Sequence, residues 1–74
     1  MKRAMILEHL AQSEEHISLG ERHIANQLVL IARLERNGLS SKDAKDLLAR
    51  FQTLLGEHIA HRDRLRKELS EASD

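Results

Sequence analysis

The sequence contains no cysteine, proline, tryptophan or tyrosine, and Phe51 is its single aromatic residue. The absence of cysteine excludes disulfide bonds and thiolate metal sites. The shortage of aromatic side chains removes the surface on which single-stranded nucleic acids usually stack. Because proline is absent and 32% of the residues are charged, with both signs mixed, the composition favours long helices exposed to solvent.

Charge and hydropathy also restrict the partners. The 12 basic and 12 acidic residues cancel, so no net field attracts DNA, RNA or an anionic membrane. No stretch approaches the roughly 20 apolar residues of a membrane span. The apolar run 4–7 near the start is too short for the core of a signal peptide. We therefore expect a cytoplasmic protein with no nucleic-acid partner and no membrane partner.

A seven-residue repeat dominates the first half of the chain. His9, His16 and His23 are seven residues apart, and an apolar residue follows each of them. Seven residues make two turns of helix, so the repeat predicts a helix that lays one face against another helix. The centres of the two predicted apolar stripes are Leu10, Ile17, Ile24 and Ile31 in the first half, and Ala44, Phe51, His58 and Leu65 in the second. In the first half, the positions on one side of the centre are Leu7, Glu14, Glu21, Leu28 and Glu35, and those on the other side are Ile6, Ser13, Gly20, Gln27 and Leu34. In the second half, they are Leu48, Leu55, Arg62 and Leu69 on one side, and Leu47, Leu54, His61 and Glu68 on the other.

A turn is predicted around Gly38. Glycine can adopt the left-handed conformation that ends a helix, and Leu39 would then fold back on Leu34. Ser40 followed by Asp43 resembles a capping box at the start of a second helix, with aspartate in the place where glutamate is commoner. These signals agree with one another and separate two helical segments.

The predicted fold is an all-α, antiparallel two-helix hairpin that resembles a coiled coil and forms a single domain, 1–74. The first helix covers about 3–37, the turn 38–40, and the second helix about 41–70. A short connection makes the two helices antiparallel neighbours. Gly20 and Gly56 would lie opposite each other, either at a close approach of the helices or as tolerated glycines.

Two helices alone leave apolar surface uncovered. The segment Leu28, Val29, Leu30, Ile31 and Ala32 is apolar nearly all round the predicted helix, so one partner helix cannot cover it. A chain this short usually needs a staple or an oligomeric partner. We expect this segment to form an oligomer interface, in a homodimer that makes a four-helix bundle. A helical protein of another sequence is the alternative partner.

Polar residues interrupt the predicted stripe of the second helix. If the turn is centred near Leu39 and Ser40, residues whose numbers sum to about 79 lie side by side. This register places Glu21 near His58 and Ile17 near Arg62. It predicts one structural polar layer, in which Arg62 pairs with a glutamate because a buried charge is tolerated only when paired. The residues of this layer are Glu14, Glu21, His58, His61 and Arg62.

The histidines admit a second interpretation, as metal ligands. His58 and His61 are three residues apart on one helix face, and Glu21 could complete a metal site. The repeated histidines cannot share an ion, because seven residues span about 10 Å of helix. We interpret His9, His16 and His23 as boundary positions beside the core, with pH sensing as the alternative.

Three runs resemble a family of small uncharacterised bacterial helical-hairpin proteins. The runs are ERHIANQ at 21–27, IARLERNG at 31–38, and HIAHRDRL at 58–65 with EL at 68–69. The resemblance covers about residues 15–69. It implies a hairpin fold and a cytoplasmic bacterial setting, and it carries no known activity.

No pattern of catalytic residues is present. The serines fall at caps, helix-surface positions or the tail, and the glycines are isolated, so neither a nucleophile with its base nor a phosphate loop is recognisable. We expect a non-enzymatic, self-associating interaction module without a cofactor. The alternative is a bundle that binds a metal or small ligand through His58, His61 and Glu21.

Overall fold

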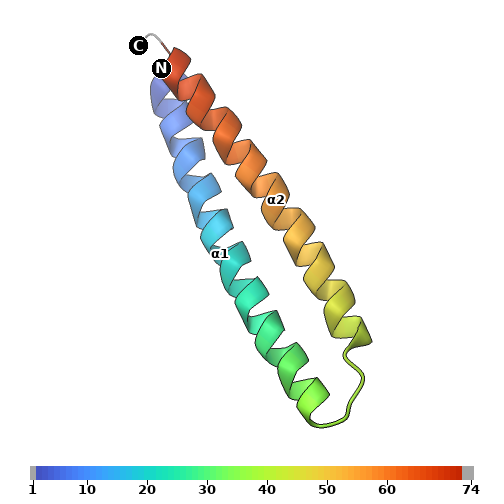
Figure 1. Cartoon of the computed structure of the whole chain (residues 1–74). Coiled ribbons are helices and arrows are strands. Elements are labelled where there is room, and N and C mark those ends of the chain that lie inside the picture. Colours follow the sequence, from blue (N-terminus) through green and yellow to red (C-terminus); the bar gives the residue numbers. More distant parts are fainter. Residues whose placement is uncertain (1, 73–74) are drawn as a thin grey trace.

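The computed structural model describes residues 2–72, which form two α-helices and no strand. Helix α1 spans Lys2–Arg36 and helix α2 spans Lys42–Glu71. The helices run antiparallel, and the start of α1 lies beside the end of α2 at the end opposite the turn (Figure 1). The predicted all-α hairpin is therefore confirmed. Each observed helix end differs by one residue from the expected ranges 3–37 and 41–70.

The hairpin is long and thin. It measures 58 × 14 × 12 Å, and its radius of gyration is 17.0 Å, against roughly 11 Å expected for a compact domain of this length. Because there is one seam between two helices, no large side chain within residues 2–72 is completely enclosed. Over the same residues, neither helix combines the length and the hydropathy that crossing a membrane requires.

The seam is the surface along which the two helices contact each other. On each helix, only one of the two rows of positions beside the apolar stripe faces the other helix. Helix α1 turns Ser13 and Gln27 towards α2, and leaves Glu14 and Glu21 exposed. This choice avoids the cost of taking carboxylates out of water. The buried residues of the seam are Ile6, Ser13, Ile17, Gln27 and Ile31 from α1, and Ala44 and Leu65 from α2.

The buried polar side chains of the seam are hydrogen-bonded across it. Gln27 Nε2 donates to the carbonyl oxygen of Ala44 at 2.8 Å. Ser13 Oγ donates to the carbonyl oxygen of His58 at 3.4 Å. Burying a polar group costs free energy mainly when the group lacks a hydrogen-bond partner. Ser13 and Gln27 therefore avoid most of this cost inside the seam, and their hydrogen bonds link the two helices at fixed points.

The turn begins as predicted at Gly38, which has a φ of +70°. The amide of Leu39 donates to the carbonyl oxygen of Leu34 at 2.9 Å, and the amide of Gly38 donates to that of Glu35 at 3.2 Å. This pair of hydrogen bonds is a Schellman motif, which satisfies the last carbonyl groups of α1. The side chain of Leu39 remains exposed.

The predicted capping box at Ser40 and Asp43 is wrong. The residue that precedes α2 is Ser41, and its hydroxyl makes no capping hydrogen bond. It donates instead to Glu35 Oε2 at 3.0 Å, which ties the turn to the end of α1. Ser40 Oγ accepts a long bond of 3.4 Å from the amide of Lys42. Asp43 lies in the first turn of α2, where a negative charge favours the helix dipole.

The predicted register is wrong by about one helical turn. The ring of His16 lies beside that of His58, and Gly20 lies against Leu55, so the numbers of facing residues sum to about 75 rather than 79. Non-helical residues advance up to about 3.3 Å each, whereas helical residues advance about 1.5 Å. The connection between the helices rises along the hairpin before α2 begins, so α2 is displaced relative to a symmetric turn (Figure 1).

The two helical glycines have different surroundings. A Cβ atom added at Gly20 would lie 3.3 Å from Leu55 Cδ1, so the helices approach closely at this point. A Cβ atom added at Gly56 would meet nothing within 4 Å. The two glycines therefore do not mark a shared point of contact.

Candidate functional site

The two sides of the seam differ in charge. We call one side the charged flank. Glu14 Oε1 on α1 lies 3.7 Å from Arg66 Nη2 on α2, and Glu35 Oε2 lies 2.9 Å from Lys45 Nζ. Ion pairs at such exposed positions contribute little stability, but they keep this side solvated. The charged flank consists of Leu7, Glu14, Glu21, Leu28 and Glu35 on α1, and of Lys45, Gln52, Ile59 and Arg66 on α2.

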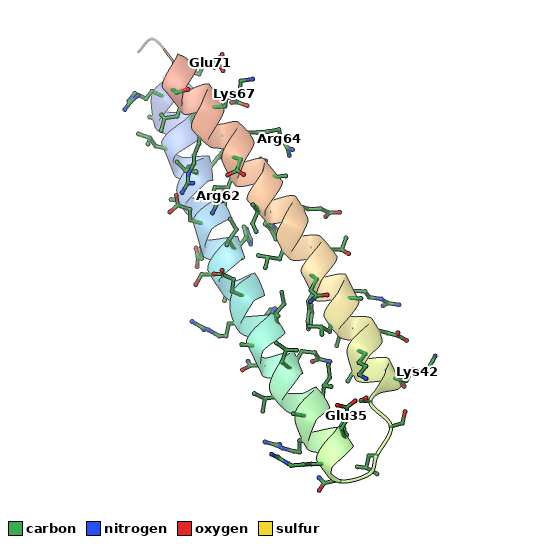
Figure 2. All side chains as sticks on the ribbon, viewed as in Figure 1. Glu35, Lys42, Arg62, Arg64, Lys67 and Glu71 are labelled. Carbon is green, nitrogen blue, oxygen red and sulfur yellow. The ribbon has the colours of Figure 1, made fainter. Side chains whose placement is uncertain are left out.

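Glu35 closes the charged flank at the turn. The Lys45 ammonium and the Ser41 hydroxyl both donate to its carboxylate, and the charge of Lys45 adds to the effect, so the pKa of Glu35 lies below its ordinary value. Figure 2 shows Glu35 at the turn end of the hairpin, beside the start of α2. The carboxylate thus joins both helices and the turn.

We call the opposite side of the seam the histidine flank. Its flanking positions carry no aspartate, glutamate, lysine or arginine over most of the hairpin. His58, at an inner position of α2, opens onto the same side, so all five histidines of the chain lie along it. The histidine flank consists of His9, His16, His23 and Leu30 on α1, and of Leu47, Leu54 and His61 on α2.

Two of the repeated histidines pack against rings of α2. The rings of His16 and His58 stack with their centroids 5.1 Å apart and their planes 7° apart. The ring of His23 lies against Phe51, with centroids 5.5 Å apart and planes tilted by 41°. Both histidines are nevertheless exposed on their outer faces. They border the seam, as predicted for the repeat, but they are less buried than a half-buried boundary position implies.

Open hollows follow the histidine flank. One, of about 450 Å³, is lined by His9, Gln12, Ser13, His16, His58 and His61. The next, of about 340 Å³, lies between His16, His23 and Leu54 over the rings of Phe51 and His58. A third borders His23, Asn26, Gln27 and Phe51. The flank is therefore a shallow groove with imidazole and leucine walls.

Large apolar side chains remain exposed beside this groove. Leu54 is 51% exposed, Leu47 41% and Leu30 40%. Met5 and Leu19 extend the same side outward along α1. An exposed apolar stripe of this length on a small protein is typical of an interaction surface.

The predicted polar layer does not form. Glu14 and Glu21 are exposed on the charged flank, and Glu14 pairs with Arg66. Arg62 is half-buried on the side of α2 that faces α1 (Figure 2). Its nearest carboxylate is that of Asp63, with Nη2 and Oδ1 3.1 Å apart. The physical reason is the rotation of α1, which leaves Glu14 and Glu21 exposed on the charged flank, where Arg66 rather than Arg62 pairs with Glu14.

The residues of the alternative metal site, His58, His61 and Glu21, are also not brought together. Glu21 lies on the charged flank, whereas His61 lies on the histidine flank, so the seam separates them. Within residues 2–72, no three histidine or carboxylate side chains come close enough to hold one ion. The structure gives no ligand geometry for the metal-binding alternative.

The predicted oligomer segment is divided between different surfaces. Ile31 is buried in the seam of the hairpin itself, with 7% of its surface exposed. Leu28 lies on the charged flank and Leu30 on the histidine flank, while Val29 and Ala32 are exposed on the outer side of α1. Only part of this segment can therefore contribute to any one interface.

No protein-family model, curated protein or solved structure matches this chain. The resemblance to bacterial helical-hairpin proteins therefore stays a prediction. The function has to be argued from the surfaces of the hairpin.

The histidine repeat predicts only the α1 half of the histidine flank, and the α2 half has a signal of its own in the sequence. Leu47, Leu54 and His61 recur every seven residues on α2, as His9, His16 and His23 do on α1. Apart from Glu68 at the end of the second series, both series lack charge, and in an antiparallel hairpin two such series lie on one side of the seam.

Proposed function

We propose that this chain is a non-enzymatic, self-associating module, and that its histidine flank packs against the same flank of a second copy. The observation that carries the proposal is the contrast between the two sides of one seam. Ion pairs close the charged flank, whereas imidazole rings and exposed leucines line the other. Apolar surface left in water favours association in proportion to its area.

The solvent-accessible surface area of the single chain supports association with a partner. The chain has an accessible surface of 5583 Å², whereas a compact monomer of 8.5 kDa exposes roughly 4,650 Å². The excess of about 900 Å² is close to the roughly 800 Å² that each partner buries in a standard protein interface. Covering one side of the hairpin along its length would bring the chain to the exposure of an ordinary small domain.

A second copy suits this surface. The flank carries no charge along its middle, so two copies meet without repulsion between like charges. A second hairpin also has the 58 Å length that covers the groove from end to end. A two-fold axis would place the same patch on both sides of the interface and produce a four-helix bundle.

Two leucines provide a matched experiment. Leu54 on the histidine flank and Leu28 on the charged flank are both 51% exposed in the hairpin. Sedimentation velocity of the unmodified chain should show a species of twice the 8.5 kDa chain mass. Leu54→Lys should weaken this association at least tenfold, because burying a leucine contributes about 1.5–3 kcal/mol.

Leu28→Lys is the control, because it adds the same charge to the flank that stays in water. It should leave the dissociation constant within about threefold of the unmodified value. A monomer at all concentrations, or equal effects of the two substitutions, would refute this assignment of the interface.

A further inference from the structure

The histidine flank carries every histidine of the chain, and histidine is the side-chain type that serves most often as a pH switch near neutrality. All five histidines of the chain border it, from His9 at one end to His23 near its middle on α1, with His58 and His61 on α2. The groove lined by His9, Ser13, His16, His58 and His61 contains no carboxylate. Within residues 2–72, none of the four ion pairs of the hairpin includes a histidine.

We infer that self-association is controlled by pH: the dimer forms when these imidazoles are neutral and separates when they gain protons. This inference rests on the proposed function, because it describes the regulation of the same surface. A neutral imidazole packs like a small apolar ring, whereas an imidazolium must keep its water or find an anion. The interface supplies apolar walls and more imidazole from the second copy.

The charged groups around the histidines do not compensate a proton. On α1, the residues three and four positions from His9, His16 and His23 are all uncharged. These residues are Met5, Ile6, Gln12, Ser13, Leu19, Gly20, Asn26 and Gln27.

On α2, the charges near the histidines nearly cancel. Arg62 lies one turn from His58, and its guanidinium is occupied by Asp63. Glu57 and Arg64, which lie one turn on either side of His61, have opposite signs and are both exposed. From the second copy, the middle of the same flank would present the same imidazole and leucine side chains, and the one carboxylate of the series, Glu68, lies seven residues beyond His61.

The stacked rings of His16 and His58 strengthen the expected effect of pH on association. The rings of His16 and His58 are nearly parallel at 5.1 Å, so two protons there would place like charges face to face. Each imidazole that must stay neutral in the dimer weakens association about tenfold between pH 7.5 and pH 5.5. Because a two-fold dimer contains each position twice, a single such position gives about a hundredfold effect.

The experiment is the dissociation constant of the full chain at about pH 7.5 and about pH 5.5, measured by sedimentation equilibrium in buffer with EDTA. We expect association to be at least a hundredfold weaker at the lower pH. In the double variant His16→Gln, His58→Gln, the ratio of the two constants should fall at least tenfold. Because the readout is a ratio for each protein, a general weakening of the variant does not affect it.

The matched control is the double variant Glu14→Gln, Glu21→Gln, which changes two titratable residues of the charged flank and keeps every histidine. Its ratio should equal that of the unmodified chain. Circular dichroism at a concentration that keeps the chain assembled should show the same helicity at both pH values.

The outcomes separate the two proposals. A chain that is monomeric at both pH values overturns the proposed function and, with it, the pH control. A dimer with equal constants at both pH values leaves the proposed function standing and overturns the pH control. An unchanged ratio in the histidine double variant, or a loss of helicity at pH 5.5 that does not depend on concentration, also overturns it.

Discussion

The same substitution, glycine to alanine, should have opposite effects at two places in this hairpin. Gly56 lies inside α2 on an exposed surface, and an added Cβ atom meets nothing within 4 Å. Gly38 lies in the turn with a φ of +70°, and an added Cβ atom there also meets nothing within 4 Å. Contacts are therefore equal at the two sites, and only the backbone conformation differs.

The magnitudes follow from that difference. In a helix interior, alanine is more favourable than glycine by about 1 kcal/mol, so Gly56→Ala should stabilise the hairpin by that amount. In the left-handed conformation, a residue with a Cβ atom costs about 1–2 kcal/mol. Part of this cost is offset in the unfolded chain, so Gly38→Ala should destabilise by about 1 kcal/mol.

The assay is thermal unfolding by circular dichroism at one fixed chain concentration, because assembly makes Tm depend on concentration. A gap of about 2 kcal/mol corresponds to roughly 8–16 °C in Tm for a domain of this size. Gly20→Ala should fall between the other two variants, because its helix gain is opposed by the displacement of the flexible Leu55 side chain. Shifts of the same sign at Gly56 and Gly38 would refute the assigned turn.

Two further predictions concern charged residues. Because the pKa of the Glu35 carboxyl is lowered on folding by Lys45 and Ser41, its contribution to stability is present above the ordinary carboxyl pKa and is lost as the pH falls through the lowered value. Glu35→Gln should therefore lose less stability than the unmodified chain between pH 7 and about pH 3 in urea titrations, and equal losses would contradict the assigned contacts. Arg62→Met, which keeps the apolar stem, should cost less than about 1 kcal/mol, because the guanidinium pairs with the exposed Asp63. A loss near 3 kcal/mol in the same titrations would instead indicate a buried ion pair.

Local signals in the sequence predicted the fold well. The heptads fixed two long helices, and Gly38 ended the first of them with the expected left-handed conformation. These features depend on residues close in the chain, where helix periodicity and capping act directly. The choice of Ser40 over Ser41 as the cap was wrong because both residues can fill that role, and Glu35 attracts the Ser41 hydroxyl.

The site was harder to predict because it depends on the register and rotation of one helix against the other. The heptads allowed either Ser13 or Glu14 to turn inward, and a hydrogen bond to the backbone of His58 accompanies Ser13. With Ser13 inward, both predicted glutamates stay exposed on the charged flank, where Glu14 pairs with Arg66, and Arg62 pairs with Asp63 instead. Non-local packing of this kind leaves a weaker trace in the sequence than a cap or a repeat does.

The central claim is that a second copy covers the histidine flank. The most direct test is methyl NMR of the leucine-labelled chain over a dilution series at pH 7.5. The signals of Leu30, Leu47 and Leu54 should change as the dimer separates, while those of Leu7 and Leu28 on the charged flank should stay constant. Signals that do not depend on concentration, or changes confined to Leu7 and Leu28, would contradict the account.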